Sequence, residues 1–374
     1  MSLPSPADVA REAEALRRGV ARANHLANVL SDPRRRAAPP AVPQVSVVVQ
    51  TCGRPALLVR CLDALRAQTC EPSAYEIVVV DDGCCDATRS LVLTLAAEAP
   101  TPAIRYLRPA AGRKGPAQAR NLGWMSASGD VIAFTDDDTI PAPDWLERGE
   151  AALTGTRGEA GRPWAALAGR VVVPPPPDPA LPTDPERMVQ GRECTEFVAA
   201  NAFVQRAALF EIGGFDERFT RAWREDLDLQ FRLQAEIGPV GRCEEAVVVH
   251  PARRERWGVS LQQQKNAYFE ALLYAKHPQR YRQHVGLPVP WDCYAIVVLA
   301  VAALALAWAG IGGSAFVSAA IAVALVMRFA IQRLRGGAND ISHVAEMLAT
   351  SALIPFLSVF WRLRGALHFR IWFL

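Results

Sequence analysis

The stretch VSVVVQTCGRPALLVRCLDAL, at residues 45–65, decides the class of fold. It opens with a β-branched run typical of a strand buried on both faces, and Pro55 then suits the first turn of a helix. The same alternation of apolar run and helical periodicity continues to residue 135. The expected strands are 45–50, 76–82, 103–107 and 131–135, and the expected helices are 55–68, 86–98 and 116–127. This order predicts an α/β fold with a mainly parallel sheet and helices on both faces.

The rest of this domain has a less regular pattern. A proline-rich surface loop is expected at 171–187, and the wider segment 171–195 is the expected acceptor contact. The segment 196–219 is expected to combine a strand, a short helix and a Gly-Gly turn. Beyond it we expect a helix at 225–237, a strand at 244–251 and a helix at 258–277.

Composition narrows the class of protein. A net charge of +3 over 374 residues argues against a general nucleic-acid binder. The 8 cysteines form no Cys-x-x-Cys pair, which predicts a reduced, cytosolic environment. The first residues lack the apolar core of a secretory signal peptide, and they predict a helix at 5–30 and a basic, proline-rich linker at 31–44.

The last part of the chain carries most of the apolar excess. No charged residue occurs from Cys293 to Met327, whereas one membrane span needs about 20 apolar residues. Glycines near the middle predict a hairpin of two spans at 293–310 and 314–332, with a buried hairpin in a globular core as the alternative. The run 347–361 is expected to be too short to span and to be broken by Pro355, and the basic tail after it suits a helix in the membrane interface. The expected domains are 1–44, 45–257, 258–290, 291–335 (membrane hairpin) and 336–374 (interfacial helices).

Carboxylates gather where two expected strands end. Asp81 and Asp82 follow the second strand, and Asp136-Asp137-Asp138 follow the fourth. Ligands of such sheets bind at the carboxyl ends of the strands. Neighbouring carboxylates ~5 Å apart repel by ~3 kcal/mol at an effective dielectric near 20, so the triplet needs an offsetting charge or water. A divalent cation, Mn²⁺ or Mg²⁺, explains the triplet, with a nucleotide diphosphate completing its ligands; a solvated acidic turn is the alternative.

Six segments occur together in one order along the chain. After 45–65 come EIVVVDDG (76–83), GPAQARNLGW (115–124), DVIAFTDDDTIPAPDWLE (130–147), IGGFDERF (212–219) and EDLDLQFRL (225–233). Together they resemble a family 2 glycosyltransferase of the GT-A fold, over roughly residues 44–260. The resemblance implies transfer of a sugar from a nucleotide diphosphate, usually UDP, to an acceptor hydroxyl, with inversion at the anomeric carbon.

The resemblance also implies roles for individual residues. Inversion needs a base on the acceptor side, and the family's Glu-Asp pair corresponds to Glu225 and Asp226, of which Asp226 is the expected base. The other implied residues are, for the nucleotide sugar, Thr51, Arg54, Asp81, Asp82, Arg120, Asn121, Asp136 and Asp137; for the metal, Asp136, Asp138 and His250; and, on the acceptor side, Trp223, Arg256 and Trp257. The competing interpretations are turn acids at strand ends, a surface arginine, a packed histidine, ordinary acids at a helix start and a packed tryptophan. Asp228 and Arg232, four apart on a helix, are expected to pair.

One departure bears on the class of transferase. Processive members carry Gln-x-x-Arg-Trp in this region, and Arg253 stands where the glutamine belongs. We therefore expect single transfer to a hydroxyl acceptor, lipid-linked or close to the membrane, by a multi-pass protein of the inner cell membrane whose catalytic domain is cytoplasmic. The alternatives are a polyprenyl-phosphate glycosyltransferase, a polysaccharide synthase and a non-catalytic membrane scaffold.

Overall fold

The computed structural model describes residues 43–109, 115–158, 161–174, 197–251, 256–286, 289–335 and 340–373. The expected helix at 5–30, nearly all of the linker at 31–44, and most of the loop at 171–195 lie outside these residues. The chain divides into two compact units, which are described separately. Unit 1 comprises Met1–Val172, Glu196–Ala222 and Arg232–His250, and unit 2 comprises Val173–Thr195, Trp223–Phe231 and Pro251–Leu374.

Unit 1 is built on one eight-stranded sheet, in the order β3-β2-β1-β4-β7-β6-β8-β5. Its first half is parallel and consists of β1 (Val45–Thr51), β2 (Tyr75–Asp81), β3 (Ala103–Leu107) and β4 (Val131–Asp136). Strands β1, β2 and β4 are buried along nearly their whole length, as their β-branched sequences predict. The four predicted strands are confirmed to within a residue at each end.

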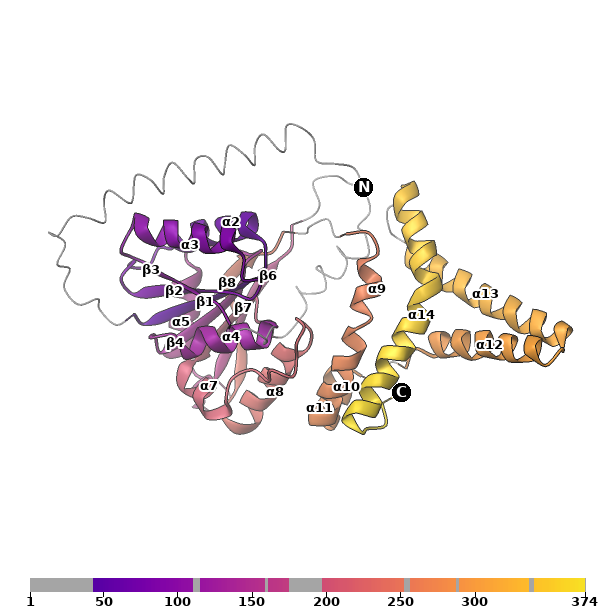
Figure 1. The fold of residues 1–374 in the computed structure, drawn as a ribbon. Helices are drawn as coiled ribbons and strands as arrows, with labels where there is room; N and C mark the ends of the chain where they lie inside the picture. Colours follow the sequence, from indigo (N-terminus) through magenta and orange to yellow (C-terminus); the bar gives the residue numbers. More distant parts are fainter. Residues whose placement is uncertain are drawn as a thin grey trace, which may run out of the picture. The chain divides into compact units, whose positions relative to one another are not determined.

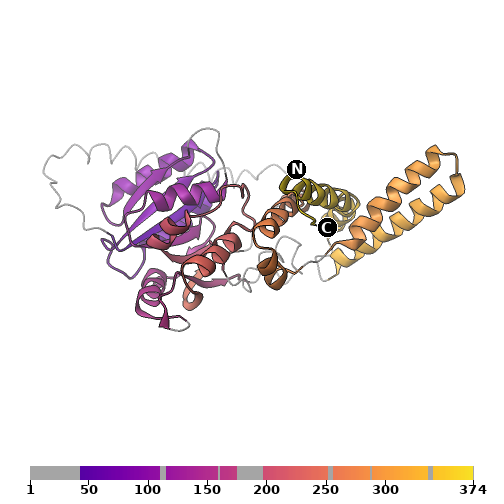
Figure 2. The same cartoon turned by 90° about the horizontal axis from the view of Figure 1, so that it is seen from below.

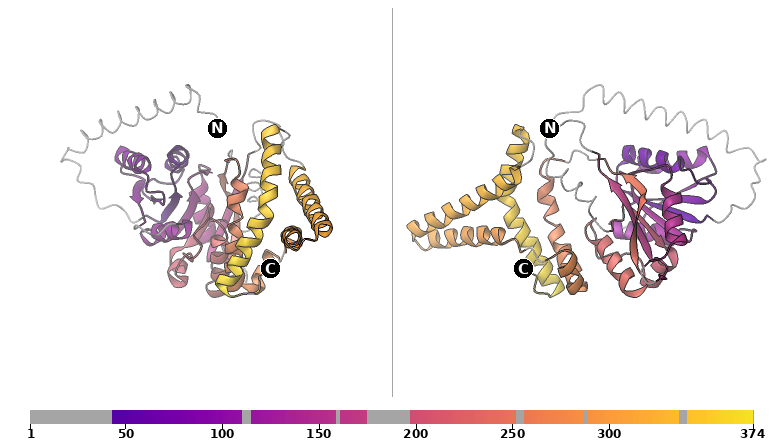
Figure 3. Two further views of the ribbon diagram at one scale, coloured as in Figure 1. Left: turned by 45° about the vertical axis from the view of Figure 1, so that its right-hand side comes forward. Right: turned by 180° about the vertical axis from the view of Figure 1, so that it is seen from behind.

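Helices cover both faces of this half of the sheet. α2 (Pro55–Arg66) and α3 (Asp86–Glu98) lie side by side on one face, and α4 (Pro116–Met125) lies on the opposite face (Figures 1 and 3). Each helix turns an apolar side toward the strands; in α2 this side is Leu58, Cys61, Leu62 and Leu65. The fold is therefore the mainly parallel α/β arrangement that the sequence predicts.

The second half of the sheet is mixed. β7 (Asn201–Gln205) runs antiparallel between β4 and β6 (Ala166–Val172), and β8 (Val240–Val249) runs parallel to β6. The short β5 (Ile140–Pro141) pairs with the far side of β8. Helices α5 (Trp145–Gly155) and α7 (Arg206–Ile212) complete this half, and α7 ends at Gly213 in the left-handed conformation. β7, α7 and the Gly-Gly turn were expected from the sequence, whereas β5, β6 and α5 were not, and β6 extends two residues into the loop expected from residue 171.

The packing of α5 against the sheet depends on Gly149. A Cβ built at this position lies 2.1–2.3 Å from ring atoms of Phe203, a buried residue of β7. We expect Gly149→Ala to lower the free energy of unfolding by about 1–3 kcal/mol, because the added methyl overpacks the core. Gly155→Ala, at the end of the same helix, is the matched control, since nothing lies within 4 Å of its Cβ. Thermal denaturation checks the pair; equal stability of the Gly149→Ala variant and the wild-type protein contradicts the tight packing.

Unit 2 contains the beginning of α8 (Glu225–Glu236) and all the later helices. The predicted single helix at 258–277 is wrong in one respect, because α9 (Val259–Gln263) ends before α10 (Asn266–Lys276) begins. α11 (Pro278–His284) follows, starting with the proline that fits the first helical turn. α10 packs along α14 (Ile341–Phe369) (Figures 1 and 3).

Helices α12 (Trp291–Trp308) and α13 (Gly312–Leu334) form the predicted antiparallel hairpin (Figure 2). In the most apolar 18-residue stretch of each helix, only 11% (α12) and 22% (α13) is buried within the protein. Such exposure argues against the alternative of a hairpin buried in a globular core. At the open end of the hairpin, the Arg328 guanidinium bonds to the Asp292 carboxylate at 2.8 and 2.9 Å. Both helices are long and apolar enough to cross a membrane.

The structure corrects the expectation for the segment around Pro355. We expected this proline to break the apolar run at 347–361, but it lies inside α14, which continues for 29 residues and is also long and apolar enough to cross a membrane. In apolar helices, neighbouring helices and hydroxyl side chains compensate for the hydrogen bond that proline removes. In the turn before Pro355, Arg333 of α13 donates to the hydroxyls of Thr350 and Ser351, and these contacts join α13 to α14.

Candidate active site

The register of the parallel strands explains why the predicted residues of unit 1 gather at one edge of the sheet. Thr51, the last residue of β1, pairs with Asp81 of β2, and the neighbouring Gln50 pairs with Asp136 of β4. The acid triplet therefore begins at the last residue of β4, the strand beside the end of β1. Because the carboxyl ends of parallel strands meet at one edge, residues far apart in the sequence come within bonding distance.

Arg54 lies at the centre of the acid triplet. Its Nη1 is 3.2 Å from a carboxylate oxygen of Asp137 and 3.2 Å from one of Asp138. The hydroxyl of Thr51 donates to the other oxygen of Asp137 at 2.7 Å. A single guanidinium thus offsets part of the repulsion between two adjacent carboxylates.

Burial makes the charge on Asp137 costly. The residue is 2% exposed, and this burial raises the pKa of its carboxyl to about 6, although Arg54 and the Thr51 hydroxyl lower it. The neighbouring carboxylates of Asp138 and Asp136 act in the same direction as burial. Burial is thus the main cause of the raised pKa, and a further cation at this edge would lower that pKa as Arg54 does.

Asp136 contacts a different arginine. Its Oδ1 is 3.0 Å from Nη2 of Arg120, whose side chain is only 3% exposed and lies over the ring of Phe215 at 5.7 Å. Arg120 comes from α4, on the opposite face of the sheet from α2. The triplet is thus flanked by two arginines, each of which can pair with a phosphate group in its planar geometry.

The predicted metal ligands are brought together in part. Nε2 of His250 lies 3.3 Å from Oδ1 of Asp138, and both side chains are buried. Among the described residues, no group of three or more His, Cys, Asp or Glu is arranged as a complete metal site. Carboxylate oxygen and imidazole nitrogen are nevertheless donors that suit Mn²⁺ or a similar cation, so Asp136, Asp138 and His250 stay a predicted ligand set.

The other acid pair is occupied by contacts within the protein. Asp81 is fully buried and accepts hydrogen bonds from the backbone N–H groups of Gly83 and Cys85, at 3.0 and 2.7 Å, and from the hydroxyl of Tyr106 at 3.0 Å. Asp82 is half-buried and accepts from the N–H of Gly115 at 3.1 Å, at the start of α4. Asp81 therefore holds the turn after β2, and Asp82 is the more accessible carboxylate of the pair.

Asn121 supports the neighbouring Gly-Gly turn. Its amide donates to the carbonyl of Phe215 at 2.9 Å and to Glu217 at 3.2 Å, and its oxygen accepts from the N–H of Phe215 at 2.8 Å and from the indole of Trp124 at 2.9 Å. The side chain is buried, and these bonds use its donors and its acceptor. The contacts in the structure are those of a residue that fixes the conformation of 213–217.

The predicted base belongs to unit 2. Glu225 and Asp226 open α8, where the helix dipole favours ionised carboxylates. Glu225 is 3% exposed, whereas Asp226 is half-buried. Of the predicted acceptor-side residues, Arg256 and Trp257 are exposed, and the indole of Trp223 donates to Glu270 at 2.7 Å. Arg253 lies outside the described residues.

Sequence reasoning missed the residues that hold the first turn of α8. Asp228 contacts Lys276 at 2.5 Å and His277 at 2.9 Å, and its expected pairing with Arg232 stays a prediction. Arg232 donates to the backbone carbonyls of Ile212 and Gly214. Arg224, a non-glycine residue at φ +74°, bonds to Glu270. No pattern in the sequence marks Glu270, Lys276 or His277, since each is separated from α8 by tens of residues.

Part of the sheet domain is similar in sequence to known proteins. Residues 46–210 match the family described as Glycosyl transferase family 2. The chain is 29% identical over 246 residues to Validoxylamine A glucosyltransferase of Streptomyces hygroscopicus subsp. limoneus. This alignment covers 58% of this chain and 51% of that protein. It is 33% identical over 97 residues to GalNAc(5)-diNAcBac-PP-undecaprenol beta-1,3-glucosyltransferase of Campylobacter jejuni, covering 26% of this chain and 30% of that one. The chain thus spans about half the length of the first of these relatives.

A solved structure is similar in fold over a longer part of the chain. The mannosyltransferase PcManGT from Pyrobaculum calidifontis, in complex with GDP-Man and Mn²⁺, superposes with a TM-score of 0.53 at 19% sequence identity, covering 95% of this chain and 97% of that one. This likeness concerns the fold alone, a curled, mostly parallel sheet with flanking helices. Residues 46–210 thus resemble glycosyl transferase family 2, and the strand order and the structural likeness show a GT-A-like fold.

Proposed function

We propose that the protein is a membrane-anchored, metal-dependent, inverting glycosyltransferase. It moves a sugar from a nucleotide diphosphate, UDP being the expected nucleotide, to a hydroxyl acceptor at the cytoplasmic face of the cell membrane. The observation that carries the proposal is the cluster of Thr51, Arg54 and the acid triplet at the carboxyl edge of a family 2 domain. This edge is where α/β sheets bind their ligands.

The residues of unit 1 supply donor binding in this proposal. Arg120 and Arg54 are the cationic groups for a diphosphate, and Asp82 is the accessible carboxylate for the base or ribose. Asp136, Asp138 and His250 would hold the divalent cation. When bound, that cation would neutralise the negative charge that develops on the departing diphosphate.

The residues of unit 2 supply the acceptor side. An acceptor hydroxyl must lose its proton as it attacks the anomeric carbon. The carboxylate of Asp226 takes that proton while the new O–C bond forms, and the electron pair of the breaking C–O bond leaves with the diphosphate. A single displacement of this kind inverts the anomeric configuration.

The apolar helices support the proposed location. α12, α13 and α14 are each long and apolar enough to span a membrane, and basic residues flank α13 on the side expected to face the cytoplasm. The resemblance to a transferase whose acceptor is undecaprenol-linked supports a lipid-linked acceptor for this chain. The Mn²⁺ and GDP-Man named for the structural neighbour support a cation and keep GDP as an alternative to UDP.

Nucleotide binding by isothermal titration calorimetry tests the proposal. The full chain in detergent is titrated with UDP, GDP and dTDP, each in Mn²⁺, in Mg²⁺ and in EDTA. We expect one nucleotide to bind at least about 10-fold more tightly with the cation than with EDTA, a difference of about 1.4 kcal/mol. Failure of all three nucleotides to bind, from protein that still melts cooperatively, contradicts the proposed function and favours a non-catalytic scaffold.

A further inference from the structure

The segment that precedes the proposed base is fastened to helix α10 by one carboxylate. Oε1 of Glu270 accepts from the indole N–H of Trp223 at 2.7 Å and from Nε of Arg224 at 2.8 Å. Its Oε2 accepts from the hydroxyl of Tyr281 at 2.8 Å. Burial raises the pKa of that phenol, and the nearby Glu270 acts in the same direction, so Tyr281 stays a donor. Both oxygens of Glu270 are therefore engaged, and its side chain is 12% exposed.

The residue that Glu270 holds has an unusual backbone. Arg224 has φ +74°, in the left-handed region that non-glycine residues rarely occupy unless the surrounding structure holds them there. Its guanidinium also lies 5.1 Å from the ring of Trp223. Its carbonyl accepts the backbone N–H of Asp228 at 3.0 Å, which closes the first turn of α8. The contacts of Arg224 therefore hold the backbone at the start of α8, two residues before Asp226.

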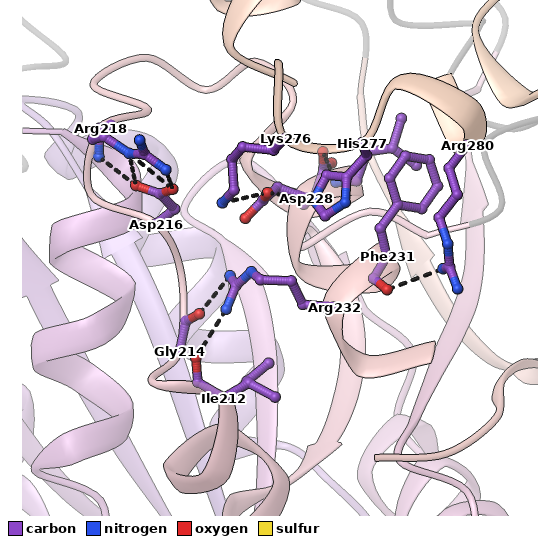
Figure 4. Close-up of polar contacts among 12 residues, drawn as sticks. Ile212, Gly214, Asp216, Arg218, Asp228, Phe231, Arg232, Lys276, His277 and Arg280 are labelled. Atoms are coloured by element: carbon purple, nitrogen blue, oxygen red, sulfur yellow. Dashed lines mark hydrogen bonds and ion pairs between the residues drawn. The ribbon is translucent and has the colours of Figure 1, made fainter. Parts of the chain in front are cut away.

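A second group of contacts joins α10 to α8 on the C-terminal side of Asp226. Asp228 is fully buried, and its Oδ1 contacts Lys276 at 2.5 Å and Nε2 of His277 at 2.9 Å, at the end of α10 (Figure 4). His277 packs edge-on against Phe231, with ring centroids 5.3 Å apart. α10 therefore holds the turn that carries Asp226 at residues 223–224 before it and at Asp228 after it.

Helix α10 is itself closely packed within unit 2. A Cβ at Gly365 of α14 would lie 2.9 Å from the Cβ of Ala271 and 3.0 Å from the carbonyl oxygen of Tyr268. The two backbones therefore approach as closely as a glycine allows. Ala271 follows Glu270 directly, so the anchoring carboxylate sits on a rigid part of the helix.

We propose that Glu270 is a positioning residue for the base, which acts by holding Trp223 and Arg224 so that the Asp226 carboxylate meets the acceptor. The proposal rests on the proposed function, because it presumes that Asp226 deprotonates the acceptor. Glu270 itself touches neither substrate nor reacting atoms. A misplacement of about 1 Å at a reacting group can cost on the order of 10²-fold in rate, so loss of the anchor acts on turnover.

The test measures turnover with water as the acceptor, so that no acceptor need be known. Hydrolysis of UDP-glucose and of GDP-mannose in Mn²⁺ is followed as release of nucleoside diphosphate from the full chain in detergent. We expect Glu270→Ala to lower kcat by about 10–100-fold and to leave KM for the donor and the affinity for the free nucleotide within about twofold. Glu270→Gln, which keeps one oxygen to accept from Trp223 and Arg224, is expected to restore part of the loss.

A double-mutant cycle separates positioning from a merely structural role. With enzyme in excess over radiolabelled donor, slow single turnovers of Asp226→Asn can be measured. If Glu270 acts through Asp226, Glu270→Ala costs little in the Asp226→Asn background, because effects of residues that act as a unit are not additive. Glu346→Gln is the control, since Glu346 of unit 2 accepts the N–H of Gly258 at 2.6 Å but contacts no residue of 223–228 in the described structure.

The outcomes distinguish the inference from the function on which it rests. Wild-type turnover with equal losses from Glu270→Ala in both backgrounds overturns the positioning role and leaves the glycosyltransferase intact. Wild-type activity that is unaffected by Glu270→Ala overturns it as well. Absence of nucleotide binding and of turnover by the wild-type protein contradicts the proposed function itself. A lower melting temperature together with a raised donor KM would mark Glu270 as structural only.

Discussion

Asp226→Asn is expected to lower sugar transfer by about 10²–10⁴-fold, the usual contribution of a positioned general base. Asparagine keeps the shape of the side chain and an oxygen acceptor, but it cannot take the proton of the acceptor hydroxyl. The N–H of Leu227 donates to Oδ1 of Asp226 at 2.8 Å, and an amide oxygen can accept the same bond. We therefore expect the start of α8 to keep its structure while turnover falls.

The measurement pairs turnover with nucleotide binding. Affinity for the nucleotide is expected to stay within about twofold of wild type, because the proposed donor residues belong to unit 1 and Asp226 to unit 2. Asp86→Asn is the matched control: Asp86 is also an acid in the first turn of a helix, α3, but it is exposed and has no proposed role. Its loss should leave turnover unchanged.

Glu225→Gln tests the alternative assignment within the Glu-Asp pair. Glu225 is buried and Asp226 is half-buried, so Asp226 is the more accessible carboxylate for a hydroxyl. Full transfer by Asp226→Asn with loss in Glu225→Gln would move the base to Glu225. Full transfer by both variants would mean that neither carboxylate is the base.

The first half of the fold was predictable because its signals are local. β1, β2 and β4 are β-branched runs buried on both faces, and α2, α3 and α4 have the periodicity of helices with one apolar side. β6 and β5 were missed because their pairing depends on partners far along the chain. β6, with the sequence ALAGRVV, becomes a strand only between β7 and β8.

Helix continuity was predicted less well than helix existence. Pro355 lies inside α14, where Arg333 of α13 donates to the hydroxyls of Thr350 and Ser351 one turn earlier and joins the two helices. Such contacts depend on a second helix, which the local sequence does not contain. Conversely, the break between α9 and α10 was not predicted, because no proline or glycine marks it in the sequence.

The candidate site likewise contains residues whose position could be predicted from the sequence and residues whose contacts could not. Strand-end positions predicted that both acid clusters lie at the carboxyl edge of the sheet, and the strand register puts Thr51 beside them. The same reasoning could not foresee that the hydrogen bonds of Asp81 are directed to its own turn, or that Asn121 holds residues 213–217. Those partners are set by loop conformation. The contacts of Glu270 could not be predicted, because a single glutamate on a distant helix carries no sequence signal for its partners.

Asp138→Asn is expected to abolish the dependence of nucleotide binding on the divalent cation. Loss of a residue that only supports a metal ligand costs about 10–100-fold in metal affinity, and loss of a direct ligand should cost at least as much. In calorimetry, the nucleotide affinity of the variant in Mn²⁺ should fall to the wild-type value in EDTA. Asp136→Asn should behave in the same way, with a further loss of stability, because it leaves the buried guanidinium of Arg120 without its 3.0 Å carboxylate contact.

The stability of the Asp138 variant separates a cation site from a structural ion pair. Removing one of three adjacent carboxylates relieves repulsion of the kind that contributes to the raised pKa of Asp137. It also removes one of the two contacts of Arg54, a side chain that is 37% exposed, where an ion pair is worth about 1 kcal/mol or less. We therefore expect the melting temperature in EDTA to change little, with Asp130→Asn, at the opposite end of β4, as the exposed control. A large fall in stability together with unchanged cation dependence would make the triplet a structural element and would remove the metal from the proposal, because repulsion among the acids would then be offset by Arg54 and Arg120 alone.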